Sequence, residues 1–132
     1  MGEHILIVDD NLEVCEVMQA ALIEQGYDVT CAASCQEAHQ VLQRQPVDLA
    51  LVDLLMPGTP GVVVAQEVAA SGAAVVLMTG ALDEELPDHL KFTVLRKPFR
   101  LEVLRDTVHC ALAERRRGGA QPVALGEVER SD

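Results

Sequence analysis

The sequence predicts a doubly wound α/β domain, with a five-stranded parallel sheet and helices on both faces. Short runs of four to six apolar residues alternate with amphipathic segments of helical length along the chain. Runs without polar positions are typical of strands buried on both faces, and β-α alternation implies right-handed crossovers between parallel strands. The 132 residues suffice for one domain with one core, and no internal repeat interrupts them. We therefore expect three layers in a single domain.

The first half of the chain predicts strands at about 4–9, 28–32 and 47–53, separated by two helices. The first helix, at about 11–25, has one apolar stripe that consists of Leu12, Cys15, Met18 and Leu22. Gly26 ends this helix as a left-handed cap. Ser34 begins the second helix, because Glu37 three residues later completes a capping box, and Pro46 ends it.

The second half continues the alternation after a breaker-rich loop at 56–61. It predicts a helix at about 62–71, strands at about 74–79 and 92–96, and a final helix at about 100–116. The inward stripe of that final helix consists of Leu101, Leu104, Val108 and Leu112. The pattern is weak from 80 to 91, so we expect the helix between the last two strands to be short or missing. Residues 117–132 are expected to form a polar, flexible tail.

The composition argues against several classes of function. The net charge is −11, and the first 90 residues contain 15 acidic side chains but one basic side chain, Arg44. Such a surface repels a duplex, so we expect no nucleic-acid partner. No apolar stretch reaches the about 18 residues that a membrane span needs, and no signal peptide is evident. The four cysteines form no C-x-x-C pair, which indicates small buried hydrophobes in a reducing, cytoplasmic setting.

Polar residues stand at the carboxyl ends of four of the expected strands. In chain order they are Asp9 and Asp10, Asp53, Thr79 and Lys97. The carboxyl ends of parallel strands share one edge of a sheet, and open α/β sheets bind ligands there. We therefore expect three carboxylates, a hydroxyl and an ammonium to converge.

The chemistry of this cluster fits a divalent cation and a phosphoryl group. Asp9 and Asp10 share a loop and need a counter-charge, which Mg²⁺ would supply as a hard cation that prefers oxygen ligands. Asp53 is either a third ligand or a nucleophile, since carboxylates can accept phosphoryl groups. Thr79 and Lys97 can hold phosphoryl oxygens. For single residues a helix cap, a strand position or a solvated surface explains the pattern as well, but it does not explain all five together.

Four motifs at these strand ends resemble the receiver domain of two-component response regulators. They are Val8-Asp9-Asp10-Asn11, Asp53-Leu54-Leu55-Met56-Pro57-Gly58 with Gly61, Met78-Thr79-Gly80, and Arg96-Lys97-Pro98-Phe99. The resemblance covers about residues 3–116 and implies a flavodoxin-like three-layer sandwich with strand order 2-1-3-4-5. It implies a protein that takes a phosphoryl group from a sensor histidine kinase or a histidine phosphotransfer domain and is not otherwise an enzyme.

The resemblance implies roles for the acidic residues. Asp53 matches the phosphoacceptor. Asp10, Asp53 and the backbone carbonyl of Leu55 match the direct Mg²⁺ ligands, with Asp9 acting nearby or through water. Leu55 and Ala81 flank the approach to Asp53, and neither side chain can position an attacking water. Hydrolysis of the aspartyl phosphate is therefore expected to be slow.

Further roles follow from the same resemblance. Lys97 matches the cation that pairs with the acceptor and then with the phosphoryl oxygens. Thr79 matches the hydroxyl that moves to bond the phosphoryl group. Pro98 occupies the family's cis-prolyl position, and Gly80 and Ala81 are supporting positions after Thr79.

Two departures from the family pattern concern signal output. Val94 stands where most receivers carry Tyr or Phe, and Phe92 lies two residues earlier on the same side of the strand. The interval between Thr79 and Lys97 is shorter than in most receivers. We therefore expect a changed output surface, a downstream protein target and no DNA-binding domain of the chain's own; a homodimer stays open.

Three alternatives stay open beside this hypothesis. A Mg²⁺-dependent phosphatase of the haloacid dehalogenase type needs Asp-x-Asp after the first strand, where this chain has Asp9-Asp10-Asn11-Leu12. A flavodoxin-like FMN module needs a Ser/Thr/Gly loop for the phosphate and aromatic residues for the flavin, and the chain lacks both. A degenerate receiver would keep the fold and serve only protein interaction.

Overall fold

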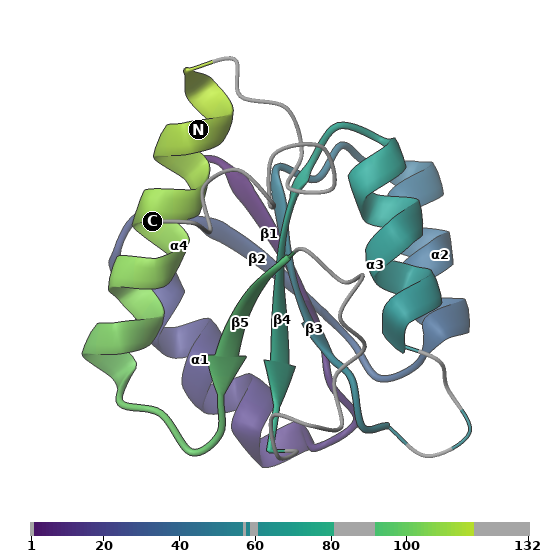
Figure 1. The fold of residues 1–132 in the computed structure, drawn as a ribbon, viewed down its shortest axis with the longest axis horizontal. Helices are drawn as coiled ribbons and strands as arrows, with labels where there is room; N and C mark the ends of the chain where they lie inside the picture. The colour runs from purple at the N-terminus through teal and green to yellow at the C-terminus, as the bar shows by residue number, and fades with distance from the viewer. Residues whose placement is uncertain (1, 57, 59–60, 81–91, 118–132) are drawn as a thin grey trace.

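The computed structural model describes residues 2–56, 58, 61–80 and 92–117. Five parallel strands in the described part form one sheet in the order β2-β1-β3-β4-β5, as expected. The strands are β1 (His4–Val8), β2 (Asp28–Ala32), β3 (Leu49–Asp53), β4 (Ala74–Thr79) and β5 (Thr93–Arg96). The helices are α1 (Leu12–Glu24), α2 (Cys35–Arg44), α3 (Gly61–Ala70) and α4 (Leu101–Arg116). Figure 1 shows α1 and α4 on one face of the sheet and α2 and α3 on the other.

Each face of the sheet carries its own apolar core. In β1, Ile5 and Ile7 pack toward α1 and α4, whereas Leu6 and Val8 pack toward α2 and α3. The alternation follows from the two-residue period of a strand. β1, β3 and β4 are buried almost throughout, while the edge strands β2 and β5 are partly exposed. The three-layer prediction is therefore confirmed.

The bounds of the helices and strands agree with the sequence-based bounds to within two residues. Two of the predicted inward positions are wrong. Leu12 is 64% exposed and Leu101 is 37% exposed. Each is the first residue of its helix, at the rim of the sheet, so the side chain finds no strand to pack against. The other members of both stripes are buried.

The predicted helix caps are present. Gly26 has a φ of 98°, the left-handed conformation that glycine adopts without strain, and the next amide, of Tyr27, donates to the Leu22 carbonyl at 3.2 Å. At the start of α2 the Ser34 hydroxyl accepts from the Glu37 amide at 3.1 Å. The Glu37 carboxylate accepts from the amide of Ala33, one residue before the position that a standard capping box uses.

Some expectations lie outside the described residues. These are the short or missing helix within 81–91, the tail beyond residue 117, and the position of Ala81. Within the described ranges, no helix is both long and apolar enough to cross a bilayer.

Candidate functional site

The backbone at the carboxyl edge of the sheet is fixed beyond the strand ends. Three main-chain hydrogen bonds extend the sheet by one residue on three strands. They join the Asp9 amide to the Ala32 carbonyl at 3.0 Å, the Leu54 amide to the Met78 carbonyl at 2.9 Å, and the Lys97 amide to the Thr79 carbonyl at 2.9 Å. Because these bonds hold the first residue of each loop, the side chains at the edge start from rigid positions.

Asp9 is held at both carboxylate oxygens and is only 1% exposed. One oxygen accepts from the Asn11 amide at 2.9 Å, and the other accepts from the Lys97 ammonium at 2.8 Å. The Asn11 side chain in turn accepts from the Val14 amide at 3.2 Å and so caps α1. The loop after β1 therefore orients a buried charge and starts a helix at once.

Asp53 has the same arrangement at the end of β3. One of its oxygens accepts from the Leu55 amide at 3.0 Å, and the other accepts from the Lys97 ammonium at 3.1 Å. A carboxylate has about four lone-pair sites, so each oxygen keeps capacity for a further partner. Asp53 is 6% exposed, which leaves it near the surface but fixed in orientation.

Lys97 bridges the two buried carboxylates. Burial lowers the pKa of its ammonium, but the hydrogen bonds to Asp9 and Asp53 outweigh this effect, and the pKa is raised above its ordinary value. The Lys97–Pro98 peptide bond is cis, as the resemblance implied. The lysine is therefore a permanent positive charge between two aspartates that would otherwise repel each other.

Three carboxylates come close enough to share a metal ion. Asp9, Asp10 and Asp53 each offer one oxygen, and these oxygens lie within 4.8 Å of one another. Oxygens on opposite sides of an octahedral Mg²⁺ lie about 4.2 Å apart, so small side-chain rotations suffice to bind it. Asp10 is exposed and can turn toward an ion, whereas the other two are buried. The donor set fits Mg²⁺ in both chemistry and spacing.

The remaining predicted site residues lie around this cluster. Thr79 is fully buried at the end of β4, and Gly80 follows it at the same edge. Leu55 donates its amide to Asp53 while its side chain is 57% exposed beside the site. The described residues Asp9, Asp10, Asp53, Leu55, Thr79, Gly80, Lys97 and Pro98 are thus gathered at one edge.

The comparison with protein families decides the identity of the domain. The model of the response regulator receiver domain matches residues 5–109, which is most of the chain. The chain belongs to the response regulator receiver family.

Known relatives of this receiver domain are regulatory proteins. It is 38% identical over 90 residues to the transcriptional regulatory protein AruR of Pseudomonas aeruginosa, a match that covers 64% of this chain and 37% of AruR. It is 29% identical over 105 residues to the regulatory protein VanR of Enterococcus faecium, covering 76% of this chain and 46% of VanR. The matched part thus spans less than half the length of these relatives.

Solved structures give the same fold. A CheY-like receiver domain from Methanospirillum hungatei superposes with a TM-score of 0.79 at 23% identity. The superposition covers 90% of this chain and all of that one. The five-stranded fold is therefore that of a CheY-like receiver.

The aromatic residue of this region, Phe92, lies directly before β5. Phe92 is 7% exposed, and it packs with Val94 in the core on the α2–α3 face. The two side chains therefore face the same side of the sheet, as the sequence predicts, and Val94 lies nearer the carboxyl end of β5 than Phe92 does.

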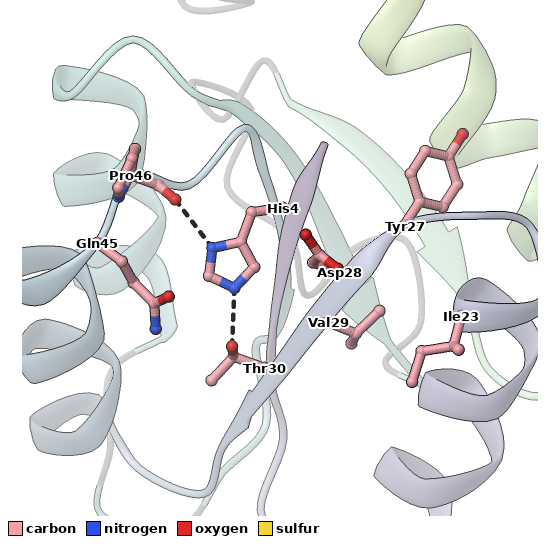
Figure 2. A pocket seen from close by; sticks show the side chains of 8 residues that line it. All are labelled: His4, Ile23, Tyr27, Asp28, Val29, Thr30, Gln45 and Pro46. Carbon is pink, nitrogen blue, oxygen red and sulfur yellow. Dashed lines mark hydrogen bonds between the residues drawn. The ribbon is translucent and has the colours of Figure 1, made fainter. Parts of the chain in front are cut away.

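A pocket of about 530 Å³ lies at the opposite end of the receiver sheet. Figure 2 shows the His4 ring in this pocket between Pro46 and Thr30. Nδ1 lies 2.8 Å from the Pro46 carbonyl, which can only accept, so Nδ1 carries the proton; Nε2 lies 2.7 Å from the Thr30 hydroxyl. Both ring nitrogens have partners within the protein, and the pocket is remote from the carboxylate cluster.

Two features of the site were missed by sequence reasoning. Lys97 was expected to pair with Asp53, yet its ammonium is as close to Asp9. The thiol of Cys15 donates to the Asp9 carbonyl at 3.3 Å. The sequence placed Cys15 correctly in a buried stripe, but apolar spacing cannot reveal a polar contact with a neighbouring loop.

Proposed function

We propose that this receiver accepts a phosphoryl group on Asp53 from the phosphohistidine of a sensor kinase or a histidine phosphotransfer domain, in a Mg²⁺-dependent reaction. The supporting observation is that Lys97 and a main-chain amide fix both oxygens of a nearly buried carboxylate. A nucleophile held in one orientation loses little entropy on reaching the transition state.

The residues divide the transfer between them. An oxygen of Asp53 attacks the phosphorus, the bond from phosphorus to the imidazole nitrogen breaks, and its electron pair stays on that nitrogen. Lys97 neutralises negative charge on the phosphoryl oxygens while its bond to Asp9 keeps it in place. The Thr79 hydroxyl bonds a phosphoryl oxygen after the transfer, and Gly80 and Ala81, the next residues in the chain, support it.

Asp10, Asp53 and the backbone carbonyl of Leu55 would hold the metal, with Asp9 acting nearby or through water. Bound Mg²⁺ would neutralise charge on the phosphoryl group and on the carboxylates. The three carboxylates already lie near one another, so the ion would need little rearrangement of the chain.

Wider aspects of the function rest on the family and on composition. We propose a receiver domain at about 3–116, in the cytoplasm where kinases supply phosphohistidine. Leu55 and Ala81 offer no group to position water, so the phosphoryl group leaves slowly without a phosphatase. The acidic surface favours a protein target over DNA for this domain; AruR is named a transcriptional regulator, and this chain covers 37% of it.

The test is incubation with acetyl phosphate and Mg²⁺, read by intact mass. We expect one phosphoryl adduct that EDTA prevents and Asp53→Asn removes. Asp28→Asn, at the exposed start of β2, is the matched control and should keep the adduct. A folded protein without adduct from any donor would favour a degenerate receiver. Turnover of a phosphomonoester would favour a phosphatase, and a yellow purified protein would favour the FMN module.

A further inference from the structure

Two cysteines lie directly behind the phosphorylation site. Cys15 is on α1 and Cys31 is on β2, and both pack in the core on the α1–α4 face. The Cys31 thiol donates to the Cys15 carbonyl at 4.0 Å, so its sulfur lies against the residue that carries the other thiol. The chain thus brings two cysteines from different elements into contact, although they are 16 residues apart.

Both cysteines are linked to the backbone of Asp9. The Cys15 thiol donates to the Asp9 carbonyl at 3.3 Å. Cys31 pairs with Ile7 in the sheet and immediately precedes Ala32, whose carbonyl accepts from the Asp9 amide. The peptide groups on both sides of the Asp9 side chain therefore depend on the positions of these two residues.

We propose that Cys15 and Cys31 form a reversible disulfide when the protein meets a hydroperoxide, and that this bond slows phosphoryl acceptance at Asp53. The second half of this inference rests on the proposed function; the first half does not. In a reducing compartment such a bond is transient and serves sensing, not stability.

The chemistry is a two-electron oxidation by the peroxide. Cys31 is partly exposed and Cys15 is 2% exposed, so the oxidant reaches Cys31 first. Its thiolate attacks hydrogen peroxide, the O–O bond breaks, and a sulfenic acid forms; the hydroxide that leaves takes up the proton lost by the thiol and becomes water. The Cys15 sulfur then attacks the Cys31 sulfur, the S–O bond breaks, and a second water leaves.

The disulfide changes the loop that carries Asp9. Once oxidised, Cys15 has no S–H to donate, and the buried Asp9 carbonyl loses that partner. The loop must then move to regain a hydrogen bond, which displaces the Asp9 carboxylate from Lys97. Because Lys97 also bonds Asp53, the displacement reaches the phosphoacceptor.

The other two cysteines provide the background for a test. Cys35 is on α2, on the opposite face of the sheet, and Cys110 is exposed on α4. The variant Cys35→Ser with Cys110→Ser keeps only the proposed pair and removes the other thiols, of which the exposed Cys110 could link two molecules. Cys31→Ser added to that variant leaves one buried thiol as the matched control.

The test treats these full-length variants with hydrogen peroxide and measures intact mass and thiol alkylation. We expect the two-cysteine variant to lose the mass of two hydrogen atoms and both alkylation sites, and to recover them with dithiothreitol. The Cys31→Ser control should show no such loss. Gain of oxygen at Cys31 without loss of hydrogen, or linkage only between molecules, would overturn the proposal.

A second readout measures the rate of phosphorylation by acetyl phosphate and Mg²⁺. We expect the disulfide form to react about tenfold more slowly, as misplaced catalytic groups do, and dithiothreitol to restore the rate. An equal rate in both forms would refute the proposal that the disulfide slows phosphoryl acceptance. A reduced protein that takes up no phosphoryl group but still forms the disulfide would count against the proposed function and leave the modification site intact.

Discussion

Lys97 is the residue on which the site depends most. It separates two buried aspartates that no other described side-chain cation contacts, with bonds of 2.8 and 3.1 Å. The sequence predicted Lys97 at this edge because it follows a strand in an acidic domain. It could not predict the bond to Asp9, because the choice between neighbouring carboxylates depends on side-chain conformation in the folded state.

Replacing Lys97 with Met should destabilise the protein by about 3 kcal/mol, because two buried charges then lose their partner. Urea unfolding in EDTA measures this loss. The control is Arg100→Met. Arg100 pairs with Glu102, and the two side chains are 80% and 61% exposed. The free energy of unfolding of this control should stay within about 0.5 kcal/mol of that of the unaltered protein. Equal stability of the Lys97 variant and the unaltered protein would contradict the role of the bridge.

The same lysine predicts a pH dependence. Its pKa is raised in the folded state from the ordinary value of 10.5. Its contribution to the free energy of unfolding is therefore fully present below that pH. The contribution is lost as the pH rises through the raised pKa. The stability difference between the unaltered protein and Lys97→Met in EDTA should therefore be constant at neutral pH and shrink above about 10.5. Urea unfolding over this range measures it, and a difference that grew with pH would contradict the assignment.

At the scale of elements, the end of α4 is held to the sheet more firmly than the sequence suggests. Arginines at the end of a helix ordinarily indicate only a favourable interaction with the helix dipole. In the structure Arg115 bonds the Gly72 carbonyl at 2.9 Å and Asp48 at 2.8 Å, and Asp48 also accepts from the His4 amide at 2.8 Å. Apolar periodicity predicts where a helix lies and which face it buries, but not which strand ends its charged terminus reaches.

Asp48→Ala should therefore destabilise the protein by about 2 kcal/mol, since it leaves the His4 amide and Arg115 without their shared acceptor. Glu114→Ala is the control, because its contact with Arg117 is 3.8 Å long and exposed, and it should change stability by under about 0.5 kcal/mol. Thermal unfolding of both variants decides the matter. Similar small losses in the two would show that Asp48 does not tie these elements together.

At the scale of the whole molecule, the sequence predicted the three layers and the edge of the sheet that carries the site. Both follow from the period of the apolar residues. The strand order and the individual roles came from the resemblance, and the family match over residues 5–109 supports it. Burial on both faces explains why β1, β3 and β4 were clear in the sequence. The prediction that Leu12 and Leu101 face the core was wrong, because a helix begins beyond the sheet at each of them.

The acidic edge should make the whole domain more stable in Mg²⁺. A ligand present at 100 times its dissociation constant adds about 2.7 kcal/mol, and the three carboxylates bind only in the folded state. Thermal unfolding should shift upward in Mg²⁺ and not in Na⁺ of equal ionic strength. Asp10→Asn should abolish most of the shift without loss of stability in EDTA, since Asp10 is exposed. An unchanged shift in that variant would remove Asp10 from the metal site.

The position of the phosphoryl group shows whether Asp53 is the phosphoacceptor. Borohydride reduces an acyl phosphate to an alcohol, so the protein phosphorylated with acetyl phosphate and Mg²⁺ should yield homoserine at position 53 on peptide sequencing by mass. A phosphoryl group found on a serine, threonine or histidine would contradict the assignment of Asp53 as the phosphoacceptor. Homoserine in place of another aspartate would contradict it too.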